Sequence, residues 1–68
     1  MSRLTTKACA AVLAAEYGRA IEQDYNVAHQ RFGQWVCNNY LRPGVVWSEL
    51  FYKTNTDAFR LIDEEQFG

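Results

Sequence analysis

The fold of this chain can be predicted from residues 26–44, NVAHQRFGQWVCNNYLRPG. Up to Leu41 the apolar residues of this segment recur at the spacing of an amphipathic helix, and Asp24 or Asn26 offers a capping side chain at the start of that helix. The apolar face of this helix is the most aromatic in the sequence, so we expect it at the centre of the core. This face comprises Ala28, Phe32, Trp35, Val36 and Asn39, with Tyr25, His29 and Tyr40 beside them. Pro43 and Gly44 then end the helix.

Another helix is predicted before this segment, from Thr5 or Thr6 to about Asp24. Either threonine can cap it, and five alanines between residues 8 and 15 supply the highest helix propensity of any residue type. The apolar stripe of this helix comprises Cys9, Leu13, Tyr17, Ala20 and Ile21. A second face has small residues, against which another helix could approach closely. This face comprises Leu4, Ala8, Ala11 and Ala15.

Residues 45–52, after the break, are apolar but few. We expect a helical turn from Ser48 to Tyr52, with a short strand as the alternative. Thr54 and Asp57 have the spacing of a capping box, with Asp in place of the usual Glu or Gln, and predict a third helix from Asn55 to about Glu65. The side chains expected to be buried here are Ala58, Phe59, Leu61 and Ile62, with Phe67 folding back to close the core.

These elements predict one small, mostly α-helical domain over residues 1–68. The two longer helices would pack as a hairpin and the third would cross them, with the short turn or strand after Pro43 as an extra element. A chain of this length buries only about 60% of the surface that its unfolded form exposes, so its core is thin. Aromatic residues make up 15% of the sequence, and we therefore expect some aromatic surface to contact a partner or a second copy of the chain.

The formal net charge of −1 argues against two classes of partner. Sequence-independent nucleic-acid binders and anionic-membrane binders both need a basic patch, so we expect neither activity. No stretch is long enough to span a bilayer. Arg3 and Lys7 precede an apolar run, but this run is short and ends at Glu16 without a clear cleavage site. We therefore expect no signal peptide and a cytoplasmic location.

No residue pattern predicts an enzyme active site. His29 is the only histidine, and Cys37 would lie about 12 Å further along the same predicted helix and on a different face. The four glycines are too far apart for a phosphate-binding loop, and no Cys or His spacing matches a metal site. We expect no catalytic residue, metal or cofactor. Cys9 and Cys37 are interpreted as reduced thiols, with a single disulfide as the alternative.

Six residues are candidates for contact with a partner. Four polar side chains project from one side of the helix predicted over residues 26–41: Gln30, Arg31, Gln34 and Asn38. Side chains of these types read base edges in DNA, but few cations accompany them to hold phosphates. A protein-binding face suits them at least as well, and a plain solvated face is the simplest interpretation. Trp47 and Tyr52 are the other two candidates, because Trp and Tyr are enriched at interface hot spots. The alternative for Trp47 is a place in the core.

Several short pieces occur in a fixed order between residues 31 and 62. They are Arg31-Phe32-Gly33-Gln34, Asn38, Leu50-Phe51-Tyr52 and Ala58-Phe59-Arg60-Leu61-Ile62. In this order they resemble a group of short, mostly uncharacterised bacteriophage and prophage proteins. The resemblance implies a cytoplasmic protein made during infection or carried in a prophage. Very small phage proteins often bind a host enzyme or a defence complex and block it, and anti-CRISPR proteins are similar in size and in lacking motifs.

Three functions follow as hypotheses. The first is a stoichiometric protein–protein inhibitor of a bacterial host or defence complex, similar in kind to anti-CRISPR proteins. The second is a small dimeric regulator that binds DNA through the helix over residues 26–41, and it requires a basic patch around Arg31. The third is a homo-oligomeric phage structural component that associates through the alanine side of the first helix.

Overall fold

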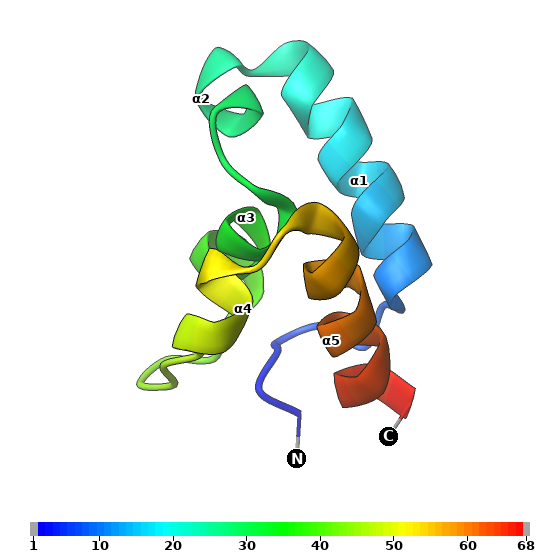
Figure 1. Cartoon of the computed structure of the whole chain (residues 1–68), viewed down its shortest axis with the longest axis vertical. Coiled ribbons are helices and arrows are strands. Elements are labelled where there is room, and N and C mark those ends of the chain that lie inside the picture. The colour runs from blue at the N-terminus through cyan, green and yellow to red at the C-terminus, as the bar shows by residue number, and fades with distance from the viewer. Residues whose placement is uncertain (1, 68) are drawn as a thin grey trace.

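The computed structural model describes residues 2–67, which fold into five helices joined by short connections (Figure 1). The helices are α1 (Ala10–Gln23), α2 (Tyr25–Ala28), α3 (Phe32–Tyr40), α4 (Ser48–Tyr52) and α5 (Asn55–Phe67). No strand is formed within residues 2–67, where the β-type pairing is an isolated antiparallel bridge between Leu4 and Leu41. The predicted mostly α-helical class is confirmed.

The helices pack in two groups that share α5 (Figure 1). Helix α3 packs against α4 and α5, α1 packs against α2 and α5, and α1 also contacts α3 directly. Five side chains are fully buried where these elements meet: Leu4, Leu13, Val36, Leu50 and Ile62. Each comes from a different element, so the core depends on every part of the chain except α2. The rest of the buried core is Ala10, Phe32, Trp35, Trp47 and Ala58.

Helix α1 begins at Ala10, and the prediction of a start at Thr5 or Thr6 is wrong. Thr6 does not cap a helix; its hydroxyl accepts a hydrogen bond from the Ala8 amide at 3.1 Å within a local turn. The later start of α1 is explained by contacts with Gln66 of α5. The side-chain amide of Gln66 donates to the backbone carbonyls of Thr6 at 3.0 Å and Ala8 at 2.6 Å, which holds this backbone outside a helix.

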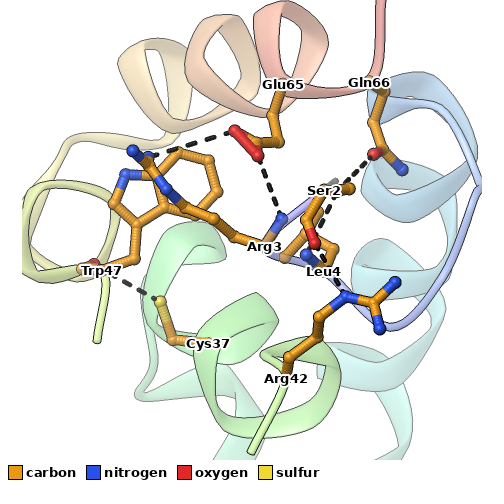
Figure 2. A network of polar contacts seen from close by, with 8 residues as sticks. All are labelled: Ser2, Arg3, Leu4, Cys37, Arg42, Trp47, Glu65 and Gln66. Atoms are coloured by element: carbon orange, nitrogen blue, oxygen red, sulfur yellow. Dashed lines mark hydrogen bonds and ion pairs between the residues drawn. The ribbon is translucent and has the colours of Figure 1, made fainter. Parts of the chain in front are cut away.

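Residues 2–8 instead form an extended N-terminal strap that links α3, α5 and Trp47 (Figure 2). The bridge at Leu4 rests on two backbone bonds, from Thr5 to Tyr40 at 2.6 Å and from Arg42 to Arg3 at 3.0 Å. Leu4 itself is 1% exposed, so it belongs to the core and not to a small-residue helix face. Because burial of a leucine stabilises a fold by about 1.5–3 kcal/mol, the strap is an integral part of the domain.

Arg3 joins the strap to Glu65 on α5 and to Trp47 (Figure 2). Its backbone amide donates to Glu65 at 3.0 Å, and its guanidinium lies 4.0 Å from the same carboxylate. The guanidinium also stacks over the Trp47 ring, 4.5 Å from the ring centroid. This cation–π contact covers one face of Trp47 and helps to leave that side chain only 7% exposed.

The helix predicted over residues 26–41 is interrupted at residues 29–31, so this prediction is wrong in its continuity. Arg31 has extended backbone angles (φ −71°, ψ 159°). Side chains from elsewhere in the fold bind the backbone at the break: the Tyr17 hydroxyl donates to the Gln30 carbonyl, and Asn55 Oδ1 accepts from the Phe32 amide at 2.9 Å. They satisfy groups that a continuous helix would have paired internally. The predicted cap by Asp24 is confirmed for α2, where its carboxylate accepts from the Asn26 amide at 2.9 Å.

Helices α3 and α4 approach so closely that their contact requires a glycine. A Cβ atom added at Gly33 would overlap the backbone carbonyl oxygen of Leu50 and lie 3.2 Å from the Ala58 Cβ. The turn between the two helices also uses glycine, since Gly44 has a φ of 81°, in the left-handed region.

The C-terminal half follows the sequence pattern closely. The helical alternative for Ser48–Tyr52 is confirmed, and α5 begins at Asn55 as predicted. The Thr54 hydroxyl accepts from the Asp57 amide at 3.3 Å, which is the capping bond that their spacing predicts. Two predictions of burial are wrong: Phe59 is 38% exposed, and Phe67 is 72% exposed and does not close the core.

Candidate functional site

An open groove is lined by α3, α4 and the loop that joins them. Its volume is about 330 Å³. We call it the α3–α4 groove. It is lined by Cys37, Asn38, Leu41, Val45, Val46, Trp47, Ser48, Phe51 and Tyr52. Most of these side chains are apolar, so the groove suits an apolar side chain of a ligand better than a charged one.

Two apolar side chains of the groove stand out in solvent. Val46 is 83% exposed and Tyr52 is 70% exposed. The buried Trp47 also contributes to the lining, and its carbonyl accepts a weak hydrogen bond from the Cys37 thiol at 3.8 Å. The groove therefore joins a fixed apolar base with exposed apolar edges, which is the arrangement found where proteins dock on one another.

The structure brings three of the six predicted contact residues to this groove: Asn38, Trp47 and Tyr52. Arg31 lies beside it, because its Nη1 donates to the Tyr52 carbonyl at 3.2 Å. Asn38 is bound in turn to Gln30, whose Oε1 accepts from the Asn38 amide at 3.2 Å.

Exposure separates the six predicted contact residues. Arg31, Asn38 and Tyr52 are exposed, while Gln30 and Gln34 are half-buried. Trp47 is buried beneath Arg3, so its indole is part of the core, which was the alternative interpretation of this residue. The polar face predicted on one long helix is divided, since Gln30 lies in the break and Gln34 and Asn38 lie on α3.

Val46 is the most exposed apolar residue of the groove, and it was not among the six predicted contact residues. The sequence does indicate that Val46 could be exposed. It lies two positions after Gly44, in a loop that is too short to bury all three residues of the Val45-Val46-Trp47 run. The loop projects from the edge of the molecule (Figure 1), and of the three side chains only Trp47 reaches the core.

A second open groove, of about 390 Å³, lies where α1, α3 and α5 meet. It is lined by Ala14, Tyr17, Phe32, Asn55, Thr56 and Phe59. Two of these side chains have structural tasks, because Tyr17 and Asn55 bind the backbone at the break between α2 and α3. Phe59, at 38% exposure, is its one largely accessible aromatic side chain. This groove therefore offers a ligand fewer free groups than the α3–α4 groove.

Three titratable side chains lie against neighbouring groups of the fold. Burial raises the pKa of the Cys37 thiol, which disfavours the reactive thiolate. The Tyr40 hydroxyl donates to Glu16 at 2.8 Å, and this hydrogen bond, together with burial and the charge of Glu16, raises the pKa of Tyr40. His29 is exposed and packs edge-on against Tyr25, with ring centroids 4.4 Å apart.

Residues 2–67 contain no group of three His, Cys, Asp or Glu side chains placed to hold a metal ion, and Cys9 and Cys37 are both free thiols. None of the five helices has the length and apolar character needed to cross a bilayer.

Comparison with protein-family models, with curated proteins and with solved structures finds no match for this chain.

Proposed function

We propose that this chain is a small binding protein that inhibits a bacterial host or defence complex by stoichiometric contact through the α3–α4 groove. One observation carries the proposal: Val46 and Tyr52 are 83% and 70% exposed at the edges of a groove whose base is fixed by the core. Exposed apolar side chains around a concave surface are typical of protein interaction sites.

The chemistry of the groove suits recognition of a protein. Tyr52 combines a large apolar ring with a hydroxyl, and tyrosine is among the residues that contribute most to interface energies. Asn38 and Arg31 stand near it and offer polar side chains at the edge. A buried apolar centre with polar groups around it is the usual anatomy of an interface.

The groove is also well supported from behind. Gly33 allows α3 and α4 to lie in backbone contact, and the Cys37 thiol binds the carbonyl of Trp47. The Arg3 guanidinium stacks over the Trp47 ring, 4.5 Å from the ring centroid. A surface fixed in advance loses less conformational entropy on binding, which favours affinity in a protein that acts by binding alone.

The bacterial target is supported by the resemblance to bacteriophage and prophage proteins. Among the residues that carry this resemblance, Asn38, Phe51 and Tyr52 also line the groove. The pieces that carry the resemblance and the candidate surface therefore coincide in part. Other residues of the same pieces are buried: Phe32, Gly33, Leu50, Ala58 and Ile62.

The proposal is tested by affinity capture from a bacterial lysate with the tagged chain and two tyrosine variants. Wild type should retain one stoichiometric complex, and Tyr52→Ala should lose it. Tyr25→Ala is the matched control, because Tyr25 is 77% exposed on α2, away from the groove lining. Equal capture by the two variants would place the contact elsewhere. Capture of no specific protein by wild type, with no effect of the expressed chain on phage or plasmid, would end the proposal.

A further inference from the structure

Arg31 stands beside the α3–α4 groove, next to Tyr52. Its Nη1 donates to the Tyr52 carbonyl at 3.2 Å, so the guanidinium is held at a residue that lines the groove. This is the one hydrogen bond that the Arg31 side chain makes within residues 2–67, and Arg31 is exposed. Because a guanidinium carries donors on each of its nitrogens, most of them remain available to a ligand at the edge of the groove.

The backbone at Arg31 is anchored as well. Phe32, the next residue, is 3% exposed, and its amide donates to Asn55 Oδ1 at 2.9 Å. Together the two hydrogen bonds tie the start of α3 to the segment that joins α4 to α5 (Figure 1). A side chain held through both its backbone and its Nη1 loses less conformational entropy on binding than an unattached surface arginine does.

The positive charge of Arg31 has no acidic partner within residues 2–67. The one ion pair of these residues joins Arg3 to Glu65. Lys53, which directly follows Tyr52, is likewise without an ion pair in the described chain. Arg31 is therefore free to attract a carboxylate, which a guanidinium binds through parallel hydrogen bonds.

Two acidic side chains lie close to Lys53 in the sequence, Glu49 on α4 and Asp57 on α5. Both are exposed, and neither forms an ion pair within the described chain. Exposed charges that stay apart attract one another weakly, because water and salt screen them. The chain's own carboxylates therefore do not occupy the guanidinium of Arg31.

A phosphate would also pair with Arg31, but the rest of the chain favours a protein as the partner. The net charge of −1 leaves few further cations to follow a phosphate backbone. Most of the groove lining beside Arg31 is apolar, and Val46 and Tyr52 are 83% and 70% exposed there. These side chains suit contact with an apolar side chain of a protein.

We propose that the occupant of the α3–α4 groove is an acidic segment of a partner protein, in which a carboxylate paired with Arg31 lies next to an apolar side chain that enters the groove. This inference rests on the proposed function only in that the groove binds a protein. It adds the chemistry of the partner and makes Arg31 a residue that determines specificity. The apolar side chain supplies most of the affinity, and the carboxylate fixes the position of the segment.

Selection from a library of random displayed peptides tests the proposal, with wild type, Arg31→Glu and Arg19→Glu as immobilised baits. Wild type should enrich peptides in which Asp or Glu lies within about two residues of a large apolar residue, the spacing that lets one short segment reach both Arg31 and the groove. Arg31→Glu should lose this acidic preference and enrich Lys or Arg instead. Such a reversal cannot result from unfolding. Arg19→Glu is the matched control, because Arg19 is exposed on α1, which contributes nothing to the groove lining, and it should keep the acidic preference.

A synthetic peptide from the wild-type selection separates this inference from the proposed function. Its dissociation constant, measured by fluorescence anisotropy, should rise on the order of tenfold in Arg31→Ala and in Tyr52→Ala, and should stay within about twofold of wild type in Arg19→Ala. Peptides that require Tyr52 but show no acidic preference would overturn the pairing with Arg31 and leave the proposed function standing. Failure of wild type to enrich any peptide would also overturn the inference. So would binding of a single-stranded oligonucleotide that is lost in Arg31→Glu, because it would assign Arg31 to nucleic acid.

Discussion

Replacement of Gly33 by alanine should destabilise the protein, although the same replacement usually strengthens a helix. Alanine is favoured over glycine inside helices by about 1 kcal/mol. At Gly33, however, the new Cβ would overlap the Leu50 carbonyl oxygen and press on Ala58. The carbonyl belongs to the backbone, so it cannot turn aside as a side chain would; α3 and α4 must separate.

The size of the effect follows from these two opposing contributions. Overpacking of a tight interior contact costs about 1–3 kcal/mol and occasionally more, and the gain in propensity is small near the start of α3. We expect a net loss of about 1–3 kcal/mol in the free energy of unfolding. In a domain of this size each kcal/mol corresponds to about 4–8 °C in Tm.

Gly18→Ala is the matched control for this prediction. Gly18 lies within α1, and a Cβ at this position would meet nothing within 4 Å. This variant should gain about 0.5–1 kcal/mol, so the two alanines should have opposite signs. Urea unfolding followed by fluorescence of Trp35 and Trp47, both 7% exposed, measures both. A Gly33→Ala variant as stable as wild type would refute the close approach of α3 and α4.

Two further predictions concern the N-terminal strap and the Tyr40–Glu16 pair. Leu4→Ala should cost about 2–5 kcal/mol because Leu4 is 1% exposed, whereas Val46→Ala, at an 83% exposed position, should stay within about 0.5 kcal/mol of wild type; urea unfolding of both variants checks this. Tyr40→Phe removes the hydrogen bond to Glu16 and should cost about 0.5–1.5 kcal/mol at neutral pH. Because the folded state raises the pKa of Tyr40, the folded protein holds this proton more tightly than the unfolded chain does. The stability that Tyr40 contributes is therefore complete below the ordinary tyrosine pKa of about 10 and is lost as the pH rises through the folded-state value. Unfolding midpoints measured across that range should fall less in Tyr40→Phe than in wild type, and parallel curves would contradict the assigned role of Glu16.

Local signals explain the parts of the fold that the sequence predicted well. The Thr54 cap lies within three residues of the amide it binds, so the start of α5 could be read directly. The helical turn at Ser48–Tyr52 and the burial of Phe32, Trp35 and Val36 likewise follow from the spacing of neighbouring residues.

The predictions that failed depend on contacts between distant residues. The start of α1 is set by Gln66, about sixty positions along the chain, and the break before α3 is supported by Tyr17 and Asn55. No proline or glycine marks either point. The candidate site likewise combines features that local sequence predicts with features that depend on distant residues. Tyr52 was predicted as a contact residue and is exposed. The burial of Trp47 depends in part on Arg3 of the N-terminal strap, and the exposure of Val46 was not predicted.

Site-specific photo-crosslinking in bacterial cells tests most directly whether the α3–α4 groove is a surface for protein contact. A photoreactive phenylalanine in place of Tyr52 would sit at the groove, and the same replacement of Tyr25, on α2, is the control. We predict that position 52 becomes covalently joined to a second polypeptide, either a bacterial protein or another copy of the chain, and that position 25 does not. Crosslinks from neither position, or equally from both, would contradict a role of the α3–α4 groove in protein contact.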